Sequence, residues 1–188
     1  FNITLKPTGL ANIRLTPAHS ILVANHPLGG LDAVVLIYLL KEKYPNLTFI
    51  VNDLLLGIPH LKEHFVGVNK LGRADKISLL KIEKLFASNK PICVFPSGLV
   101  SRKIRGQVID LEWKKAFVKK AVRHEKTIVP IHIDGALSNR FYRLSTLRRF
   151  LGIEFNIEML FLVDEFYKLK NTTINVTVGK PIPSNTFT

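Results

Sequence analysis

The sequence predicts an α/β fold: a single domain built on a mostly parallel, twisted β-sheet flanked by helices. Apolar segments of strand length alternate with segments of helix length along the chain, a pattern typical of such sheets. The chain has 188 residues, 47% of them hydrophobic, so it can bury one sizeable core. The absence of long polar tracts and short repeats excludes a disordered chain and a solenoid. We therefore expect residues 1–188 to form one domain.

The first half of the chain is predicted to contain three buried strands and two helices. The strands cover residues 20–24, 47–51 and 91–95, and the helices cover residues 31–43 and 75–87. Gly29 and Gly30 separate the first strand from the first helix, which gives the order strand, tight loop, helix. In the second helix, four apolar residues fall roughly on one face: Ile77, Leu80, Ile82 and Leu85.

The second half continues the alternation. Its predicted elements are a helix from Asp110 to about His124, a strand at 127–133, a basic amphipathic helix at 139–151 and a strand at 173–178. Asp110 is expected to cap the first of these helices. Residues 152–170 fit no single pattern, and Pro181 and Pro183 end the ordered part.

The charge of the chain is strongly positive. Lys and Arg number 27 against 14 Asp and Glu, which gives a formal net charge of +13 and a sequence pI near 10.0. Such a charge attracts nucleic acid, phosphorylated small molecules and anionic lipid headgroups alike. Composition therefore predicts an anionic partner without naming it.

Residue usage narrows the class of protein further. Cys93 is the single cysteine, so an intramolecular disulfide and a cysteine-based zinc site are excluded. The six histidines show no metal-ligand spacing, and we expect no metal. The longest apolar run, residues 33–40, is too short to span a bilayer. Because the chain starts at Phe1 without Met, we expect the native N-terminus to have been trimmed.

The segment at residues 25–32 reads NHPLGGLD and directly follows the first strand. Open α/β sheets place ligand sites at the carboxyl ends of their strands. His26 and Asp32, joined through glycines, can form a pair in which the carboxylate orients the imidazole while the ring accepts a hydroxyl proton. The same residues fit a loop histidine bonded to backbone and an aspartate that caps the next helix. Spacing alone leaves both interpretations open.

The segment at residues 95–103 reads FPSGLVSRK and is expected to form a second loop at the same site. Pro96 and Gly98 shape its turn. Three cations here and in the charged loop 104–107 offer donors for a phosphate or phosphopantetheine: Arg102, Lys103 and Arg105. A solvated turn with ordinary surface charges is the alternative. Ser97 lacks the Gly-x-Ser-x-Gly surroundings of a nucleophilic serine.

A third segment, residues 66–73, reads VGVNKLGR and precedes a predicted helix. Lys70 and Arg73 stand on this glycine-bearing loop and fit a phosphate grip. Loop cations are common on protein surfaces, so ordinary surface charges explain them equally well.

Two predicted helices carry basic surfaces. Helix 139–151 has apolar residues at helical spacing beside four arginines: Phe141, Leu144, Leu147 and Leu151, with Arg140, Arg143, Arg148 and Arg149. This fits a helix lying on an anionic membrane, or core packing with a solvated cationic rim. The helix from Asp110 places Lys115, Lys119 and Arg123 on one face, which suits an acidic partner, and Trp113, Phe117 and Ala121 on another, which suits the core.

Taken in this order, the segments resemble the lysophospholipid acyltransferase superfamily, over roughly residues 18–183. Its members carry an Asn-His-x-x-x-x-Asp block, a Gly-containing block with a phosphate-holding Arg, a Phe-Pro-Glu-Gly block and a Val-Pro block. The matching segments here are residues 25–32, 66–73, 95–102 and 128–131. The forms HPLGGLD and FPSGLVSR resemble a bacterial, hemolysin-like branch, which includes acyltransferases that make amino-acid-containing lipids.

The chain departs from the superfamily pattern at three places. Its His26-to-Asp32 gap is one residue longer, and Gly29 and Gly30 are expected to absorb the extra residue. Ser97 stands where the family has Glu, and the phosphate-holding Arg maps only loosely onto Lys70 or Arg73. These differences favour a lysolipid acceptor over plain glycerol phosphate.

The resemblance implies an O-acyltransferase of membrane lipid biosynthesis, with residues 1–188 as one acyltransferase domain. His26 and Asp32 are the implied catalytic residues. The implied substrate-binding residues are Asn25, Gly29, Gly30, Lys70, Arg73, Phe95, Pro96, Ser97, Gly98, Ser101 and Arg102. The donor would be acyl-CoA or acyl-carrier protein, with no bound cofactor, and the acceptor lyso-phosphatidic acid or a lyso-amino-acid lipid.

The expected location is the cytoplasmic face of the bacterial inner membrane, as a peripheral protein on an anionic surface, or the cytoplasm. A non-catalytic lipid-binding or scaffolding protein on the same fold is the main alternative, since Ser97 replaces Glu. A nucleic-acid-binding module would use the positive charge, but the aromatic residues do not interleave with the basic ones. We therefore expect no nucleic-acid partner.

Overall fold

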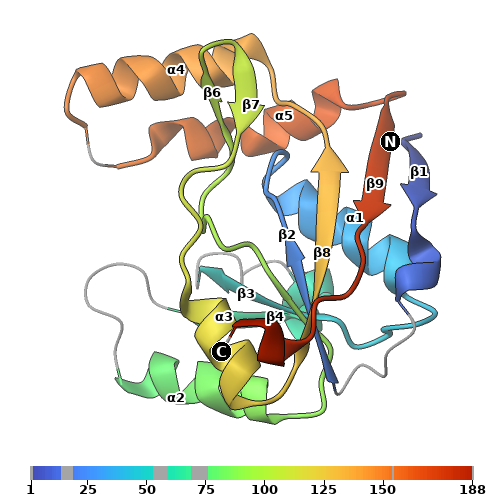
Figure 1. The fold of residues 1–188 in the computed structure, drawn as a ribbon. Coiled ribbons are helices and arrows are strands. Elements are labelled where there is room, and N and C mark those ends of the chain that lie inside the picture. The colour runs from blue at the N-terminus through green and yellow to red at the C-terminus, as the bar shows by residue number, and fades with distance from the viewer. Residues whose placement is uncertain (1, 14–18, 53–58, 69–75, 154, 188) are drawn as a thin grey trace.

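The computed structural model of the chain describes residues 2–13, 19–52, 59–68, 76–153 and 155–187 (Figure 1). Its strands are β1 (Thr4–Thr8), β2 (Ser20–Ala24), β3 (Thr48–Asn52), β4 (Phe65–Val68), β5 (Ile92–Val94), β6 (Arg102–Ile104), β7 (Gln107–Ile109), β8 (Thr127–Asp134) and β9 (Thr173–Val178). Its α-helices are α1 (Gly30–Leu40), α2 (Lys76–Ala87), α3 (Ala116–Arg123), α4 (Asn139–Phe150) and α5 (Leu162–Lys168). Short 3-10 helices are η1 (Leu10–Asn12), η4 (Pro59–His64), η5 (Ile157–Phe161) and η6 (Ser184–Phe187).

Within the described residues, seven strands form one sheet in the order β1-β9-β8-β2-β5-β3-β4. Neighbouring strands run parallel except β8 and β9, which pair antiparallel. The predicted α/β fold with a mostly parallel sheet is therefore confirmed. Because β8, β2 and β5 are parallel neighbours, the loops that follow them meet at the same edge of the sheet.

Hydrophobic clusters cover both faces of the sheet. Leu22 and Ala24 of β2 belong to the cluster that includes α1 and α4, whereas Ile21 and Val23 belong to the cluster that includes α2 and α3. All five residues of β2 are buried, as expected for a parallel strand covered on both sides. The segment that follows β2 is therefore fixed by the core of the molecule.

The predicted strands and helices agree with the structure for most of the chain. β2 and β9 have the predicted bounds, and β3, β5, β8, α2 and α4 differ from prediction by one or two residues. The edge strands β1 and β4 were not predicted. α1 ends at Leu40 rather than Lys43. In α2, Ile77 and Leu80 are exposed, because the start of this helix extends past the sheet (Figure 1).

Residues 102–124 differ from the prediction in two ways. The predicted charged loop is present as a turn, but it joins two strands that were not predicted, β6 and β7, in an antiparallel hairpin in which Arg105 and Gly106 have positive φ. The next helix, α3, begins at Ala116, so Asp110 does not cap it. The carboxylate of Asp110 instead accepts hydrogen bonds from residues that lie outside any helix. The short side chain that makes Asp a good helix cap also lets it bond to backbone groups in a loop.

The α4 helix, η5 and α5 form a helical hairpin beyond the carboxyl end of β8 (Figure 1). The sequence left helix 139–151 open between a membrane-facing helix and core packing with a solvated cationic rim, and the side chains of Phe141 and Arg148 are both buried. The outward stripe of α4 instead contains Arg143, Leu147 and Phe150. None of the helices in the described ranges is long and apolar enough to cross a membrane.

An ion-pair cluster joins α2 to α3 and gives a first testable prediction. Glu83 bonds to Lys120, to Arg123 at 3.2 Å and to His124 at 2.9 Å. Hydrogen bonds from Lys120 and His124 lower the pKa of Glu83 to about 2 from its ordinary 4.5. Glu83→Gln is expected to have a lower Tm than wild type at pH 7. The Tm difference should shrink as the pH falls from 4.5 towards 2, because wild-type Glu83 then becomes protonated and loses its ion pairs. A Tm deficit independent of pH, measured by circular dichroism, would contradict this.

Candidate active site

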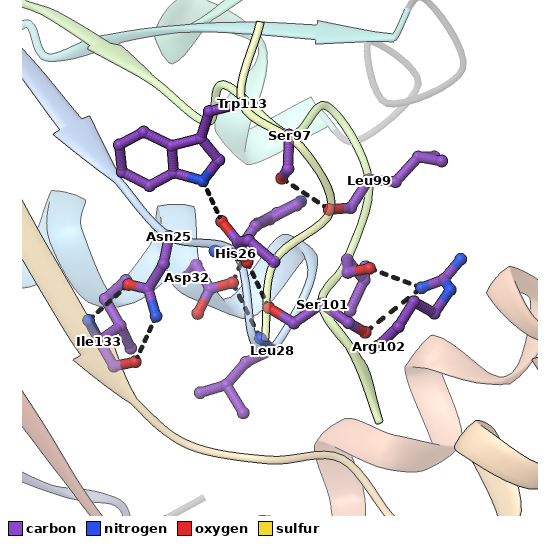
Figure 2. A network of polar contacts seen from close by, with 12 residues as sticks. Asn25, His26, Leu28, Asp32, Ser97, Leu99, Ser101, Arg102, Trp113 and Ile133 are labelled. Carbon is purple, nitrogen blue, oxygen red and sulfur yellow. Dashed lines mark hydrogen bonds and ion pairs between the residues drawn. The ribbon is translucent and has the colours of Figure 1, made fainter. Parts of the chain in front are cut away.

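The His26 loop connects the carboxyl end of β2 to α1 and contains the predicted catalytic pair (Figure 2). The His26 Nδ1 and Asp32 Oδ2 atoms are 2.9 Å apart. Asp32 lies in the first turn of α1 and is fully buried, and its Oδ2 also accepts a hydrogen bond from the backbone N–H of Leu28 at 2.9 Å. The expectation that the pair meets despite its longer loop is confirmed, and Asp32 is not the helix cap, a position that Gly29 occupies.

The two glycines allow this geometry in different ways. Gly29 has φ 69° and ψ −137°, a conformation that residues with a side chain rarely adopt. A Cβ atom on Gly29 would lie 3.1 Å from the side chain of Leu162, and one on Gly30 would lie 3.4 Å from Phe166. Gly29 therefore absorbs the extra residue, while Gly30 permits close contact with α5.

The environment of the pair determines its chemistry. Burial raises the pKa of the Asp32 carboxyl, an effect opposed by its bonds to His26 and to the Leu28 N–H. With Nδ1 directed at Asp32, the His26 Nε2 has no hydrogen-bond partner among the described residues. An imidazole held in this way is suited to accept a proton at Nε2.

Phe95 and its neighbours form the predicted second loop of the site. The Phe95 ring stacks on the His26 ring with centroids 4.3 Å apart and an interplanar angle of 21°, and its other neighbour is Phe49 at 5.7 Å. Gly98 has φ 66° and its N–H donates to the Phe95 carbonyl, closing the turn after Pro96. The Ser97 hydroxyl donates to the Leu99 carbonyl at 2.8 Å, so it serves the turn itself.

Asp110 belongs to this site, although its position in the sequence indicated a helix cap. Its Oδ1 accepts from the backbone N–H of His26 at 3.1 Å and from the Ser101 hydroxyl, and its Oδ2 accepts from Trp113 Nε1 at 2.8 Å. The Ser101 N–H in turn donates to the His26 carbonyl at 2.8 Å. Asp110 thus joins the two site loops. In the sequence, an aspartate that precedes a segment of helix length indicates a helix cap, and nothing local indicates its bond to His26.

Asn25 connects the His26 loop to the neighbouring strand. Its Nδ2 donates to the Ile133 carbonyl at 2.8 Å, and its Oδ1 accepts from the Ile133 N–H at 2.7 Å (Figure 2). The side chain therefore acts like one more backbone unit between the loop and β8. This position fixes the start of the loop that carries His26.

Arg102 does not face the site as the phosphate interpretation requires. Its side chain is 3% exposed and bonds to the Val100 carbonyl at 2.6 Å and to Glu158 at 2.9 Å. In Figure 2 its guanidinium points away from His26. Lys103 is exposed and bonds to Asn139, and Lys70 and Arg73 lie outside the described residues. Glu158, which is 56 residues away in sequence, attracts Arg102 into this ion pair.

The buried ion pairs of Glu158 give a second prediction. Glu158 is fully buried between Arg102 and Arg148, with both N–O distances at 2.9 Å. Glu158→Gln would leave two arginines without their counter-charge, so unfolding should become easier by about 3–5 kcal/mol. Chemical denaturation checks this, with Glu83→Gln as the control for an ion pair that is only partly buried. If the free energy of unfolding falls by the same small amount in both variants, a structural role for Arg102 is contradicted.

A cleft of about 620 Å³ adjoins the His26 loop. Its walls come from the loop itself, from the β6–β7 hairpin and from the end of β8, and include Asn25, Pro27, Ser101, Asp110, Trp113 and His132. Apolar side chains and a few polar groups line it together, as is usual for sites that bind small molecules. Residues from the predicted blocks 25–32 and 95–102 therefore meet at one cavity.

Comparison with known proteins identifies the family. A family model described as acyltransferase matches residues 1–187. The chain belongs to this acyltransferase family. Its sequence is 44% identical over 166 residues to the lyso-glycine lipid O-acyltransferase of Phocaeicola vulgatus and 43% identical to that of Bacteroides thetaiotaomicron, in both cases over 88% of the chain. The chain spans about 60% of the length of these acyltransferase relatives.

A solved structure shares the fold of this chain. The 1-acyl-sn-glycerophosphate (LPA) acyltransferase PlsC from Thermotoga maritima aligns with a TM-score of 0.59 at 19% identity, covering 97% of this chain and 62% of that protein. Together with the family match, this confirms the predicted membership of the lysophospholipid acyltransferase superfamily.

Proposed function

We propose that the chain is an O-acyltransferase that moves a fatty acyl group from a thioester to a hydroxyl group of a lysolipid. The observation that carries the proposal is the His26–Asp32 pair, with its 2.9 Å bond and with Nε2 without a partner among the described residues, in a loop that adjoins a cleft. Relatives at 44% and 43% identity are named lyso-glycine lipid O-acyltransferases. An acceptor that contains an amino acid is therefore favoured over lyso-phosphatidic acid.

In the proposed reaction, His26 Nε2 takes the proton of the acceptor hydroxyl as its oxygen attacks the thioester carbonyl. The new C–O bond forms, the C–S bond breaks, and the proton returns from His26 to the departing thiolate. Asp32 holds the imidazole orientation and stabilises its charged form. Phe95, stacked on the ring, restricts its rotation.

The donor and the place of reaction complete the proposal. The donor is acyl-carrier protein or acyl-CoA, and the reaction needs no bound cofactor. The acceptor and product are lipids, so the protein is proposed to work at an anionic membrane surface, on the cytoplasmic face of a bacterial inner membrane. The formal charge of +13 supports contact with such a surface.

Product analysis tests the function. The chain is incubated with acyl-carrier protein or acyl-CoA carrying a labelled fatty acid, together with a lyso-glycine lipid, lyso-phosphatidic acid or glycerol phosphate. We expect labelled diacylated glycine lipid, and at least about a hundredfold less of it with His26→Ala. If wild-type protein binds the lysolipid but never consumes a thioester, the chain is a lipid-binding protein on this fold instead.

A further inference from the structure

The helical hairpin of α4, η5 and α5 exposes large apolar side chains. We call the exposed apolar side chains of residues 147–167 the hairpin surface, among them Phe150, Leu151, Phe155, Leu160, Val163 and Tyr167. Phe150 is 85% exposed, which is unusual for a phenylalanine in a folded domain. Several large apolar side chains exposed on one helical hairpin mark a surface that contacts something else.

Cations accompany the hairpin surface. Exposed basic residues on the same two helices and just after them are Arg140, Arg143, Arg149, Lys168 and Lys170. The exposed acid Asp164 is paired with Lys168 at 3.0 Å, and Lys168 also pairs with Glu165, so the charge of Lys168 is used within α5 and the other four cations remain for a partner. Apolar groups with surrounding cations match the chemistry of a bilayer that contains anionic lipid. The acyl chains of the bilayer can bury the apolar side chains, and its anionic headgroups attract the cations.

The hairpin surface lies close to the catalytic loop. Leu162 and Phe166 on the inner side of α5 pack against Gly29 and Gly30, next to His26. Val163 and Tyr167, which follow these two residues, are exposed. Since an α-helix with its side chains is about 10–12 Å across, only one helix separates the His26 loop from whatever contacts this surface.

We propose that the hairpin surface lies on an anionic lipid bilayer, with α5 between the bilayer and the His26 loop. A lysolipid acceptor leaving the bilayer beside α5 then has a short path to His26. The inference builds on the proposed function, because that function requires a lipid acceptor. Its test nevertheless measures vesicle binding and needs no acyl transfer.

A second copy of the chain fits the hairpin surface less well. Two copies related by a two-fold axis would meet through the same patch, and this would bring Arg143 and Arg149 of both copies together. Like charges brought together at an interface oppose association. A bilayer with anionic headgroups instead offers opposite charge to every cation on the surface.

Vesicle flotation tests the proposal. The chain is mixed with vesicles of phosphatidylcholine alone, or of phosphatidylcholine and phosphatidylglycerol, and bound protein is measured without substrate. Wild-type protein is expected to float with the anionic vesicles. F150S/L151S should weaken this binding about tenfold or more through lost apolar burial, and R143E/R149E to a similar extent through lost attraction. I77S/L80S is the matched control, because these side chains of α2 are also exposed, at 64% and 61%, and should leave binding unchanged.

Each result supports or overturns the proposal. It is overturned if wild-type protein does not float, if F150S/L151S floats like wild type, or if I77S/L80S loses binding to the same extent. A wild-type dimer that F150S/L151S converts to a monomer, without vesicle binding, would assign the surface to a second copy. Transfer to acceptor in detergent micelles should stay at the wild-type rate in F150S/L151S. If wild-type protein floats but never transfers an acyl group, the proposed function fails while the membrane surface stands.

Discussion

His26→Ala is expected to reduce acyl transfer by about 10²–10⁴-fold while leaving the fold intact, because it removes the proposed general base. The side chain contacts Asp32 and Phe95 at the edge of the sheet, and its neighbours in the loop are fixed by Asn25 and Asp110 through other bonds. Circular dichroism should therefore be unchanged. Turnover of labelled thioester measures the loss.

His19→Ala is the control for this variant. His19 is exposed and directly precedes β2, whereas His26 follows the other end of the same strand. Its replacement should leave turnover within a factor of about two, the spread expected for a surface change. Wild-type turnover in purified His26→Ala protein would overturn the catalytic assignment.

Asp32→Asn is expected to reduce acyl transfer on the order of 10⁴-fold, the effect known for the amide that replaces the carboxylate of a catalytic triad. The amide keeps the shape of Asp32 but presents the wrong hydrogen-bonding group to His26, so the imidazole loses its tautomer and its counter-charge. The KM for the acceptor should change little, since Asp32 is fully buried and does not line the cleft. A mainly KM effect would contradict a role through His26.

Asp32→Asn should also change stability, in the opposite sense to Glu83→Gln. Burial raises the pKa of Asp32 above its ordinary 3.8, so the folded chain holds this proton more tightly than the unfolded chain. Wild-type stability therefore falls as the pH rises above 3.8 through the folded pKa, and Asp32→Asn lacks this loss. The Tm of Asp32→Asn minus the Tm of wild type should therefore be higher at pH 7 than at pH 4. An unchanged Tm difference would show that burial does not penalise the carboxylate.

Much of the fold could be predicted because the signals are local. The fully apolar segment 20–24 predicted a buried strand, and the alternation at residues 173–178 predicted β9 with its correct bounds. The edge strand β1 was missed because its sequence, TLKPT, lacks a continuous apolar pattern and contains Pro7. The hairpin β6–β7 was missed because each strand has only three residues and β6 contains Arg102 and Lys103.

The sequence by itself determined that His26 follows a buried strand and that Asp32 lies in the first turn of the next element. Both facts depend on neighbours within a few residues, which periodicity and glycine placement encode. Tertiary structure alone decided that Asp110, 84 residues away, bonds to the His26 N–H, and that Glu158 draws Arg102 away from the site. It also decided that α5 packs on Gly29 and Gly30. Such contacts depend on how distant segments pack, and a charge or a cap residue carries no local signal of its distant partner.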